Sequence, residues 1–316
     1  MDINKLITDN NENLSPLSVK TYTSCILKVM EILRTKNMSI LINQPDKVIK
    51  TVNEFYSNPN SAKTKLASLI VLLRSMSSTI KDSNHLKDKI NSAIQKYTEA
   101  NDGYSKQIKE QLSTNEKNNK ESGGWLTDDN INTIKENLKA EIPSKIQTIH
   151  DLNKYRNYVI FMLYDEIASR LDIADSKIIF KSNKPLDDTY NYIVLDKKNK
   201  EVDYIMNNYK TSKSYGTKNI KLNNSLYPLL LDYKKNVNKF NSDDWFLLND
   251  SGLKLSRSRL SSIYSNLGSS INKKLNVSTN RKMKVSNVID IDAIKSLADK
   301  MAHNPIEALT VYSKGE

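Results

Sequence analysis

Four short segments in the second half of the chain have extended rather than helical periodicity: Lys177-Ile178-Ile179-Phe180, Tyr190-Asn191-Tyr192-Ile193-Val194-Leu195, Glu201-Val202-Asp203-Tyr204-Ile205-Met206 and Lys218-Asn219-Ile220-Lys221-Leu222. They are rich in β-branched and aromatic residues and are joined by turns, which is typical of strands. We predict that they form one small antiparallel sheet. Because most of the remaining chain has helical periodicity, the predicted fold class is mainly α with a small antiparallel β-sheet (α+β).

The N-terminal part, residues 1–100, predicts a small helical bundle. Ser15-Pro16 is a helix start, with the serine as N-cap and the proline at the first helical position, and apolar residues then recur at helical spacing to Leu33. Further helices are predicted over about 45–56, after Asn58-Pro59-Asn60 with Ser61 as a candidate cap, and over about 84–99.

Residues 101–124 are polar and include Asn101-Asp102-Gly103 and Gly123-Gly124, so we predict a linker there. It suits a hinge between two domains that close around DNA, or a plain tether. The second domain is predicted over 125–316. Its expected helices are one capped by Thr127 and ending near 140, an apolar one around 158–163, and others over 226–237, 256–275 and about 283–302.

The chain of 316 residues carries a net charge of +12, and its 48 lysines and arginines are spread along its whole length. This distribution favours a surface that binds a polyanion such as nucleic acid. A lysine-rich surface without such a partner is the alternative.

The single cysteine, Cys25, excludes a disulfide framework and a cysteine-based zinc site, and the three histidines lie far apart in the sequence. No segment approaches the roughly 18–20 apolar residues that span a bilayer. The N-terminus has no signal-peptide pattern. We therefore expect a soluble, intracellular protein with no membrane partner.

Several residues have the chemistry of a phosphate site. His303 lies nine positions before Tyr312, and Arg281 precedes the histidine by twenty-two. Lys210 and Lys213 lie with hydroxyl residues on a predicted hairpin tip, 208–217, which suits phosphate contact but also an ordinary solvated turn. Arg170 ends a buried apolar helix and needs an anionic partner, either a phosphate or the nearby Asp172 and Asp175.

Together, these residues resemble the tyrosine recombinase (integrase) family. In that family a helical core-binding domain precedes a catalytic domain that carries an arginine, a hairpin lysine, a His-x-x-Arg pair, a histidine or tryptophan, and a tyrosine. The matching positions here are Arg170, Lys210, Ser278-Thr279-Asn280-Arg281, His303 and Tyr312. Residues 18–22 are similar to the start of the core-binding domain, and residues 169–178, 209–213 and 298–314 to the family's boxes.

The resemblance implies a site-specific DNA recombinase or integrase that cleaves and rejoins double-stranded DNA through a 3′-phosphotyrosyl intermediate. It implies no cofactor and no metal, and a homotetramer assembled on DNA. Residues 1–100 would be a SAM-like core-binding domain, 101–124 a linker and 125–316 the catalytic domain.

The resemblance also implies a role for each matching residue. Tyr312 would be the nucleophile, Arg170 and Arg281 would clamp the phosphate oxygens, His303 would donate a hydrogen bond, and Lys210 would protonate the leaving oxygen, with Lys213 as its substitute. The residues expected to contact DNA are Lys213, Ser278, Lys282, Lys20, Lys63 and Lys65.

The chain departs from the family pattern in three places. Ser278 stands where the pair has its histidine, with Lys282 as the neighbouring replacement, and the usual Thr-Gly-Leu is missing before Arg170. Four residues follow Tyr312, which leaves the mode of assembly open.

Two other functions are alternatives to a recombinase. One is a type IB topoisomerase that works as a monomer, and the other is a DNA-binding relative that has lost catalysis.

Overall fold

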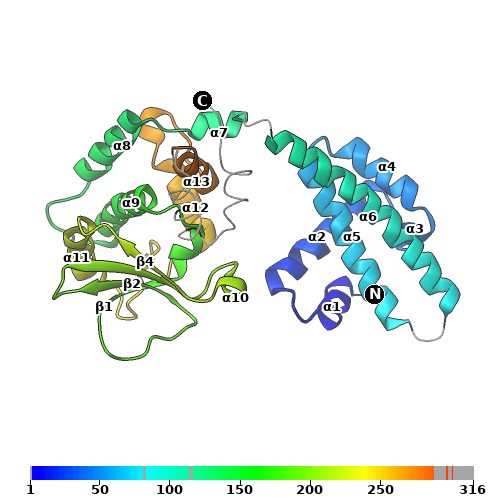
Figure 1. Cartoon of the computed structure of the whole chain (residues 1–316), viewed down its shortest axis with the longest axis horizontal. Helices are drawn as coiled ribbons and strands as arrows, with labels where there is room; N and C mark the ends of the chain where they lie inside the picture. The colour runs from blue at the N-terminus through cyan, green and yellow to red at the C-terminus, as the bar shows by residue number, and fades with distance from the viewer. Residues whose placement is uncertain (1, 81–82, 114–116, 288–296, 298–300, 302–316) are drawn as a thin grey trace. The chain divides into compact units, whose positions relative to one another are not determined.

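The computed structural model describes residues 2–80, 83–113, 117–287, 297 and 301. His303 and Tyr312 lie outside the described residues. The chain divides into two compact units, Met1–Thr114 and Asn115–Glu316, each with its own hydrophobic core (Figure 1). The boundary between the units falls inside the predicted linker.

Unit 1 is a bundle of helices. Ser15 accepts the Ser18 amide and Pro16 opens the second helix, as predicted. The structure corrects one predicted cap, because Asn58 rather than Ser61 accepts the backbone N–H of Asn60 at 2.9 Å. The described helices are α1 (Ile3–Asp9), α2 (Pro16–Ile32), α3 (Ile40–Asn43), α4 (Pro45–Phe55), α5 (Pro59–Thr79) and α6 (Asn84–Ser113).

Helix α6 continues through the first half of the predicted linker. Its buried residues Ile90, Ala93 and Tyr97 pack in the unit 1 core, and the Tyr97 hydroxyl donates to the Leu41 carbonyl at 2.9 Å. Tyr104, beyond Asn101-Asp102-Gly103, also packs against this core. Tertiary packing therefore overrides the turn-forming composition, and residues 101–113 are helix rather than linker.

Unit 2 combines helices with one sheet. The helix cap at Thr127 and the helix over 226–237 are confirmed, and the cap is a capping box completed by Asn130. The helix predicted over 256–275 ends at Asn266, because the chain turns tightly at Gly268, where a Cβ would lie 2.7 Å from the Lys273 carbonyl oxygen. The described helices are α7 (Asn119–Gly124), α8 (Asp128–Ala140), α9 (Ile149–Glu166), η1 (Leu171–Asp175), α10 (Ser212–Tyr215), α11 (Leu226–Val237), α12 (Arg257–Asn266), η2 (Ser269–Ile271) and α13 (Val277–Ser286).

The four predicted strands are present in the order β1-β2-β3-β4: β1 (Ser176–Phe180), β2 (Asn191–Asp196), β3 (Glu201–Met206) and β4 (Lys218–Leu222). The mainly α fold with a small sheet is therefore confirmed. The sheet is mixed rather than wholly antiparallel, since β1 pairs parallel with β2 while the other neighbours pair antiparallel. The parallel pair forms because the segment 181–190 carries the chain back to the end of the sheet at which β1 begins. The outer edge of β1 is covered where Phe246 N donates to the Ser176 carbonyl at 3.0 Å.

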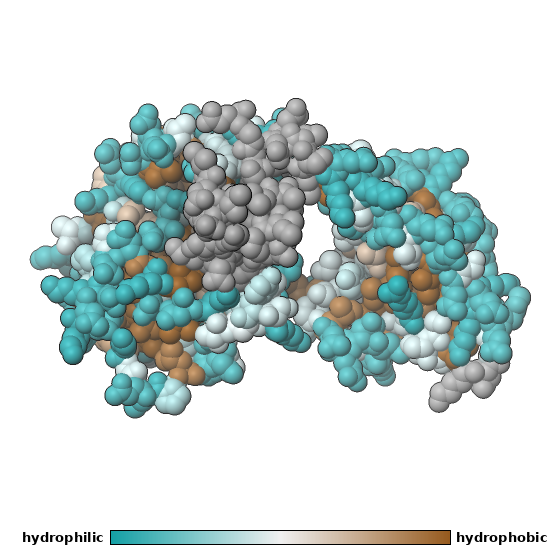
Figure 2. Space-filling model, in the orientation of Figure 1, coloured by the Kyte–Doolittle hydropathy of each residue, from teal (hydrophilic) through white to brown (hydrophobic). Residues whose placement is uncertain are grey.

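Apolar side chains of α9, α11, α12 and the sheet form the core of unit 2. Hydrophilic residues cover most of the visible face of each unit (Figure 2). Within the described ranges, no helix is both long and apolar enough to cross a membrane.

Candidate active site

Arg170 lies in the segment that connects α9 to η1, just beyond the helix that it was expected to end. Its carbonyl oxygen accepts two hydrogen bonds, from the Tyr164 hydroxyl at 3.0 Å and from the Ser169 hydroxyl at 3.1 Å. Tyr164 is buried in the core, and burial raises the pKa of its phenol well above the ordinary value. The phenol is therefore a fixed donor that holds the backbone at Arg170.

Arg281 lies on α13 and is buried, with 4% of its surface exposed. The neighbouring Asn280 donates its side-chain amide to the Tyr164 carbonyl at 2.8 Å. One turn further along α13, Lys284 binds Asp165 of α9 at 3.0 Å. These contacts dock α13 on the end of α9. Tyr164 thus binds both the backbone of Arg170 and the side chain of Asn280, next to Arg281.

The carboxylate of Asp172 lies within electrostatic reach of both arginines. It is 2% exposed, and its pKa is raised by burial, against the lowering effect of the positive charges of Arg257, Arg170 and Arg281. Both arginines, which are far apart in the sequence, therefore act electrostatically on one buried carboxylate.

Arg257 at the start of α12 binds the two carboxylates that follow Arg170. Its Nη1 lies 3.1 Å from Asp172 Oδ1, and its Nε lies 2.5 Å from Asp175 Oδ2, while Lys254 pairs with the other oxygen of Asp175. Although burial opposes the ionised form, these cations lower the pKa of Asp175. The sequence had offered both aspartates as partners of Arg170, and it gave no signal for Arg257.

Lys210 and Lys213 are exposed on the tip that joins β3 to β4, as predicted. This tip carries the short helix α10 (Figure 1). The base of this hairpin is fixed, because Tyr209 is buried and its hydroxyl donates to the Gly216 carbonyl at 2.7 Å. Asn191 of β2, which the sequence did not single out, hydrogen-bonds both to the hairpin base and to the carbonyl of Asp172. The lysine hairpin is thereby tied to the turn that follows Arg170.

Lys282 and Ser278 occupy different surroundings on α13. Ser278 is exposed in the first turn, where its backbone N–H donates to Asn276 Oδ1 at 2.7 Å. Lys282 is largely buried and forms an ion pair with Glu121 of α7, itself 5% exposed. The predicted DNA contact of Lys282 would require it to leave this carboxylate, whereas Ser278 is accessible.

The described residue nearest to His303 in the sequence is Met301. It is buried at 3% exposure and forms a small cluster with Ala168, beside Arg170, and with Val285 of α13. Met301 therefore packs against the two segments that carry Arg170 and Arg281.

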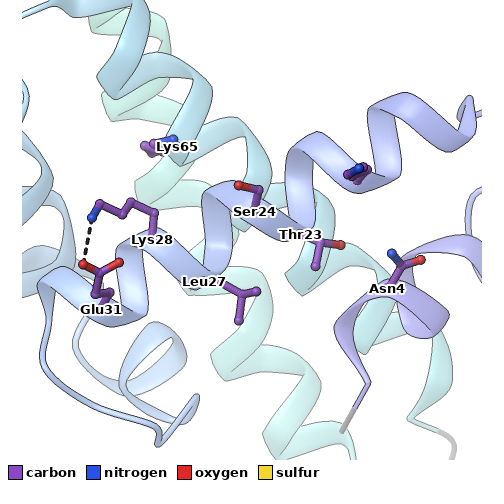
Figure 3. Close-up of a pocket in the computed structure, with 8 residues that line it drawn as sticks. Asn4, Thr23, Ser24, Leu27, Lys28, Glu31 and Lys65 are labelled. Atoms are coloured by element: carbon purple, nitrogen blue, oxygen red, sulfur yellow. Dashed lines mark hydrogen bonds and ion pairs between the residues drawn. The ribbon is translucent and has the colours of Figure 1, made fainter.

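A second basic feature lies in unit 1. Lys20 and Lys65, two predicted DNA contacts, line a groove of about 460 Å³ between α2 and α5 together with Lys28, and Thr23, Ser24 and Leu27 lie along it (Figure 3). Lys28 pairs with Glu31 at 2.8 Å, and Lys65 Nζ lies 3.1 Å from the Cys25 sulfur. Lys63, half-buried on α5, does not line this groove.

Comparison with known proteins adds no assignment, because no protein-family model and no curated protein matches the chain. Among the residues that the structure describes, no group of histidine, cysteine, aspartate and glutamate side chains is arranged to hold a metal ion.

Proposed function

We propose that the protein is a tyrosine recombinase that cuts and rejoins double-stranded DNA at specific sites. The observation that carries this proposal is a set of hydrogen bonds between segments that are far apart in the sequence. Tyr164 bonds both to the Arg170 carbonyl and to Asn280, next to Arg281, and Asn191 joins the base of the Lys210 hairpin to η1. Guanidinium groups bind phosphate through paired N–H donors, so this arrangement suits a backbone phosphodiester.

The proposed reaction begins with attack of the Tyr312 oxygen on phosphorus. The phenol gives its proton to water, a P–O bond to the tyrosine forms, and the P–O5′ bond breaks. Arg170 and Arg281 stabilise the negative charge on the non-bridging oxygens, and His303 donates a hydrogen bond to the same phosphate. Lys210 gives a proton to the departing 5′-oxygen.

This reaction is reversible without an energy source, because the 3′-phosphotyrosyl link keeps a phosphodiester bond in place of the one that broke. A 5′-hydroxyl that attacks the link restores the DNA strand and frees Tyr312. Four copies of the chain assembled on two DNA sites would then exchange strands.

Substitution of the proposed nucleophile tests the proposal. A DNA site selected from random-sequence duplexes by the full chain is placed in a nicked substrate whose short 5′-hydroxyl fragment diffuses away after cleavage. We expect the wild type to form a denaturation-resistant protein–DNA adduct. Tyr312→Phe should form none, since it lacks the attacking oxygen, while still binding the site.

The matched control is Tyr158→Phe, which removes the hydroxyl of a half-buried tyrosine on α9, away from the Arg170 segment. It should form adduct at the wild-type rate. Equal adduct yield from the wild type and Tyr312→Phe, or no adduct from the wild type, contradicts the proposal.

A further inference from the structure

Asn191 is a fully buried amide at the first position of β2, a strand that is otherwise apolar up to Asp196. An asparagine side chain has two N–H donors and an oxygen with two lone pairs. Here all four are used. Nδ2 donates to the carbonyls of Asp172 and Asn208, both at 3.0 Å, and Oδ1 accepts the backbone N–H groups of Asn207 and Asn208, both at 2.9 Å.

These bonds join two segments of the proposed site. Asp172 lies in η1, two residues after Arg170, and Asn208 lies two residues before Lys210. Other contacts hold the hairpin base to itself or to the chain before β2: Asn207 Nδ2 donates to the Tyr190 carbonyl at 2.9 Å, and Thr217 donates to Asn207 Oδ1 at 3.0 Å.

We infer that Asn191 is a positioning residue, whose side-chain amide sets where the Lys210 hairpin stands relative to Arg170. The inference rests on the proposed function, since it assigns Lys210 the delivery of a proton to the leaving oxygen. Loss of the amide leaves the pairing of β3 with β4 intact, but it removes the link between the hairpin base and η1. Because proton transfer requires hydrogen-bond distance between Lys210 and the leaving oxygen, loss of the amide slows this step.

Asn191→Asp tests this link with almost no change in shape. The aspartate keeps an oxygen for the two backbone N–H groups of the hairpin and replaces the donating NH₂ with oxygen, which faces the carbonyls of Asp172 and Asn208. The readout compares two nicked substrates, one with the natural 5′-oxygen at the cleaved bond and one with sulfur there. Sulfur leaves as a thiolate, and because a thiol has a pKa of about 8.5 it needs no proton from an acid.

On the oxygen substrate, we expect Asn191→Asp to form adduct at least about 100-fold more slowly than the wild type, the lower range for general acid catalysis. On the sulfur substrate, its rate should return to near that of the wild type. Lys210→Ala should behave in the same way. Asn236→Asp is the matched control: Asn236 is a buried asparagine whose Nδ2 donates within α11, to the Asp232 carbonyl at 3.0 Å, and its variant should show no difference between substrates.

If the wild type forms adduct, any of three results overturns the inference. These are adduct formation by Asn191→Asp at the wild-type rate on both substrates, slow adduct formation by Asn191→Asp on both, and failure of the sulfur substrate to restore the rate of Lys210→Ala. A wild type that forms no adduct on either substrate instead refutes the proposed function.

Amide hydrogen exchange of the full chain provides a second measurement with Asn191→Ser, whose shorter side chain withdraws both the NH₂ group and the oxygen that accepts the backbone N–H groups of Asn207 and Asn208. We expect faster exchange in the hairpin base around Asn207 and Asn208 and unchanged exchange in α11. Unchanged exchange at the hairpin base overturns the inference whatever the activity.

Discussion

Tyr164 connects the segments that carry the two arginines. Its hydroxyl binds the Arg170 carbonyl, and its own carbonyl accepts the side chain of Asn280, next to Arg281. Its ring lies against that of Tyr264 of α12 in the core, with the centroids 4.6 Å apart and the planes tilted by 51°. A buried aromatic ring cannot shift without disturbing its close-packed neighbours, so the two guanidinium groups are carried on a rigid base.

Removal of one guanidinium should separate catalysis from binding. Arg281→Ala is expected to slow adduct formation by about 10²–10³-fold, the usual loss when one donor to a developing oxyanion is removed. Arg281→Lys should recover part of this rate, because lysine supplies charge without the paired donors. The measurement is single-turnover cleavage of the nicked substrate, after thermal unfolding has shown that each variant folds.

The control for Arg281 is Arg259→Ala, which removes an exposed arginine that pairs with Asp250 on the same unit. It should cleave at the wild-type rate. Wild-type cleavage by Arg281→Ala would exclude the assigned role of the arginine.

At the residue scale, the types and order of Arg170, Arg281 and Lys210 predicted them as site residues, and that assignment stays a prediction. The structure adds the hydrogen bonds of Tyr164 and Asn191 that join the segments carrying them. Asn191, Arg257 and Tyr164 gave no signal, because their roles come from hydrogen bonds to backbone groups or carboxylates that only the folded chain places beside them. For Asn191, the sequence offered one hint, an amide at the start of the apolar β2, because a buried polar group needs hydrogen-bond partners.

At the element scale, α7 is held tightly against the chain around α13. Glu121 pairs with Lys282, and Leu126 N lies 3.3 Å from the Met283 sulfur. At Gly124, a Cβ would lie 2.8 Å from the backbone carbonyl oxygen of Lys274. The close approach requires glycine there.

Two adjacent glycines provide a matched test of this packing. Gly124→Ala should lower the free energy of unfolding of unit 2 by about 1–3 kcal/mol, the usual cost of overpacking. The methyl group that Gly123→Ala adds meets no atom within 4 Å, and the residue lies in helix α7. This substitution should therefore leave the free energy of unfolding unchanged or raise it by up to about 1 kcal/mol. Both tryptophans, Trp125 and Trp245, lie in unit 2, so their fluorescence during urea unfolding reports this unit. Equal stability of the two variants would contradict the close packing of α7.

The strands and most helices were predictable because their periodicity and caps are local signals. Two differences came from contacts that no local pattern contains. Helix α6 runs on to Ser113 because its buried side chains pack against the rest of unit 1, and β1 pairs parallel with β2 through a return segment that has no pattern of its own.

At the scale of the whole molecule, the net charge of +12 should make DNA binding strongly dependent on salt. Lys20 is an exposed member of the groove in unit 1, whereas Lys47 is exposed on α4 and does not line it. If Lys20 contacts a phosphate, Lys20→Ala should reduce the slope of log Kd against log salt by about one. Lys47→Ala should leave the slope unchanged. Identical slopes for both variants would exclude the groove as a DNA contact.

In the proposed reaction, one tyrosine attacks a DNA phosphate held by Arg170 and Arg281. The most direct test is to digest the purified protein–DNA adduct with protease and nuclease and to identify the modified residue by mass spectrometry. We expect a nucleotide 3′-phosphate attached to Tyr312 alone. A nucleotide on any other residue, or one attached through its 5′-phosphate, would contradict the proposed reaction.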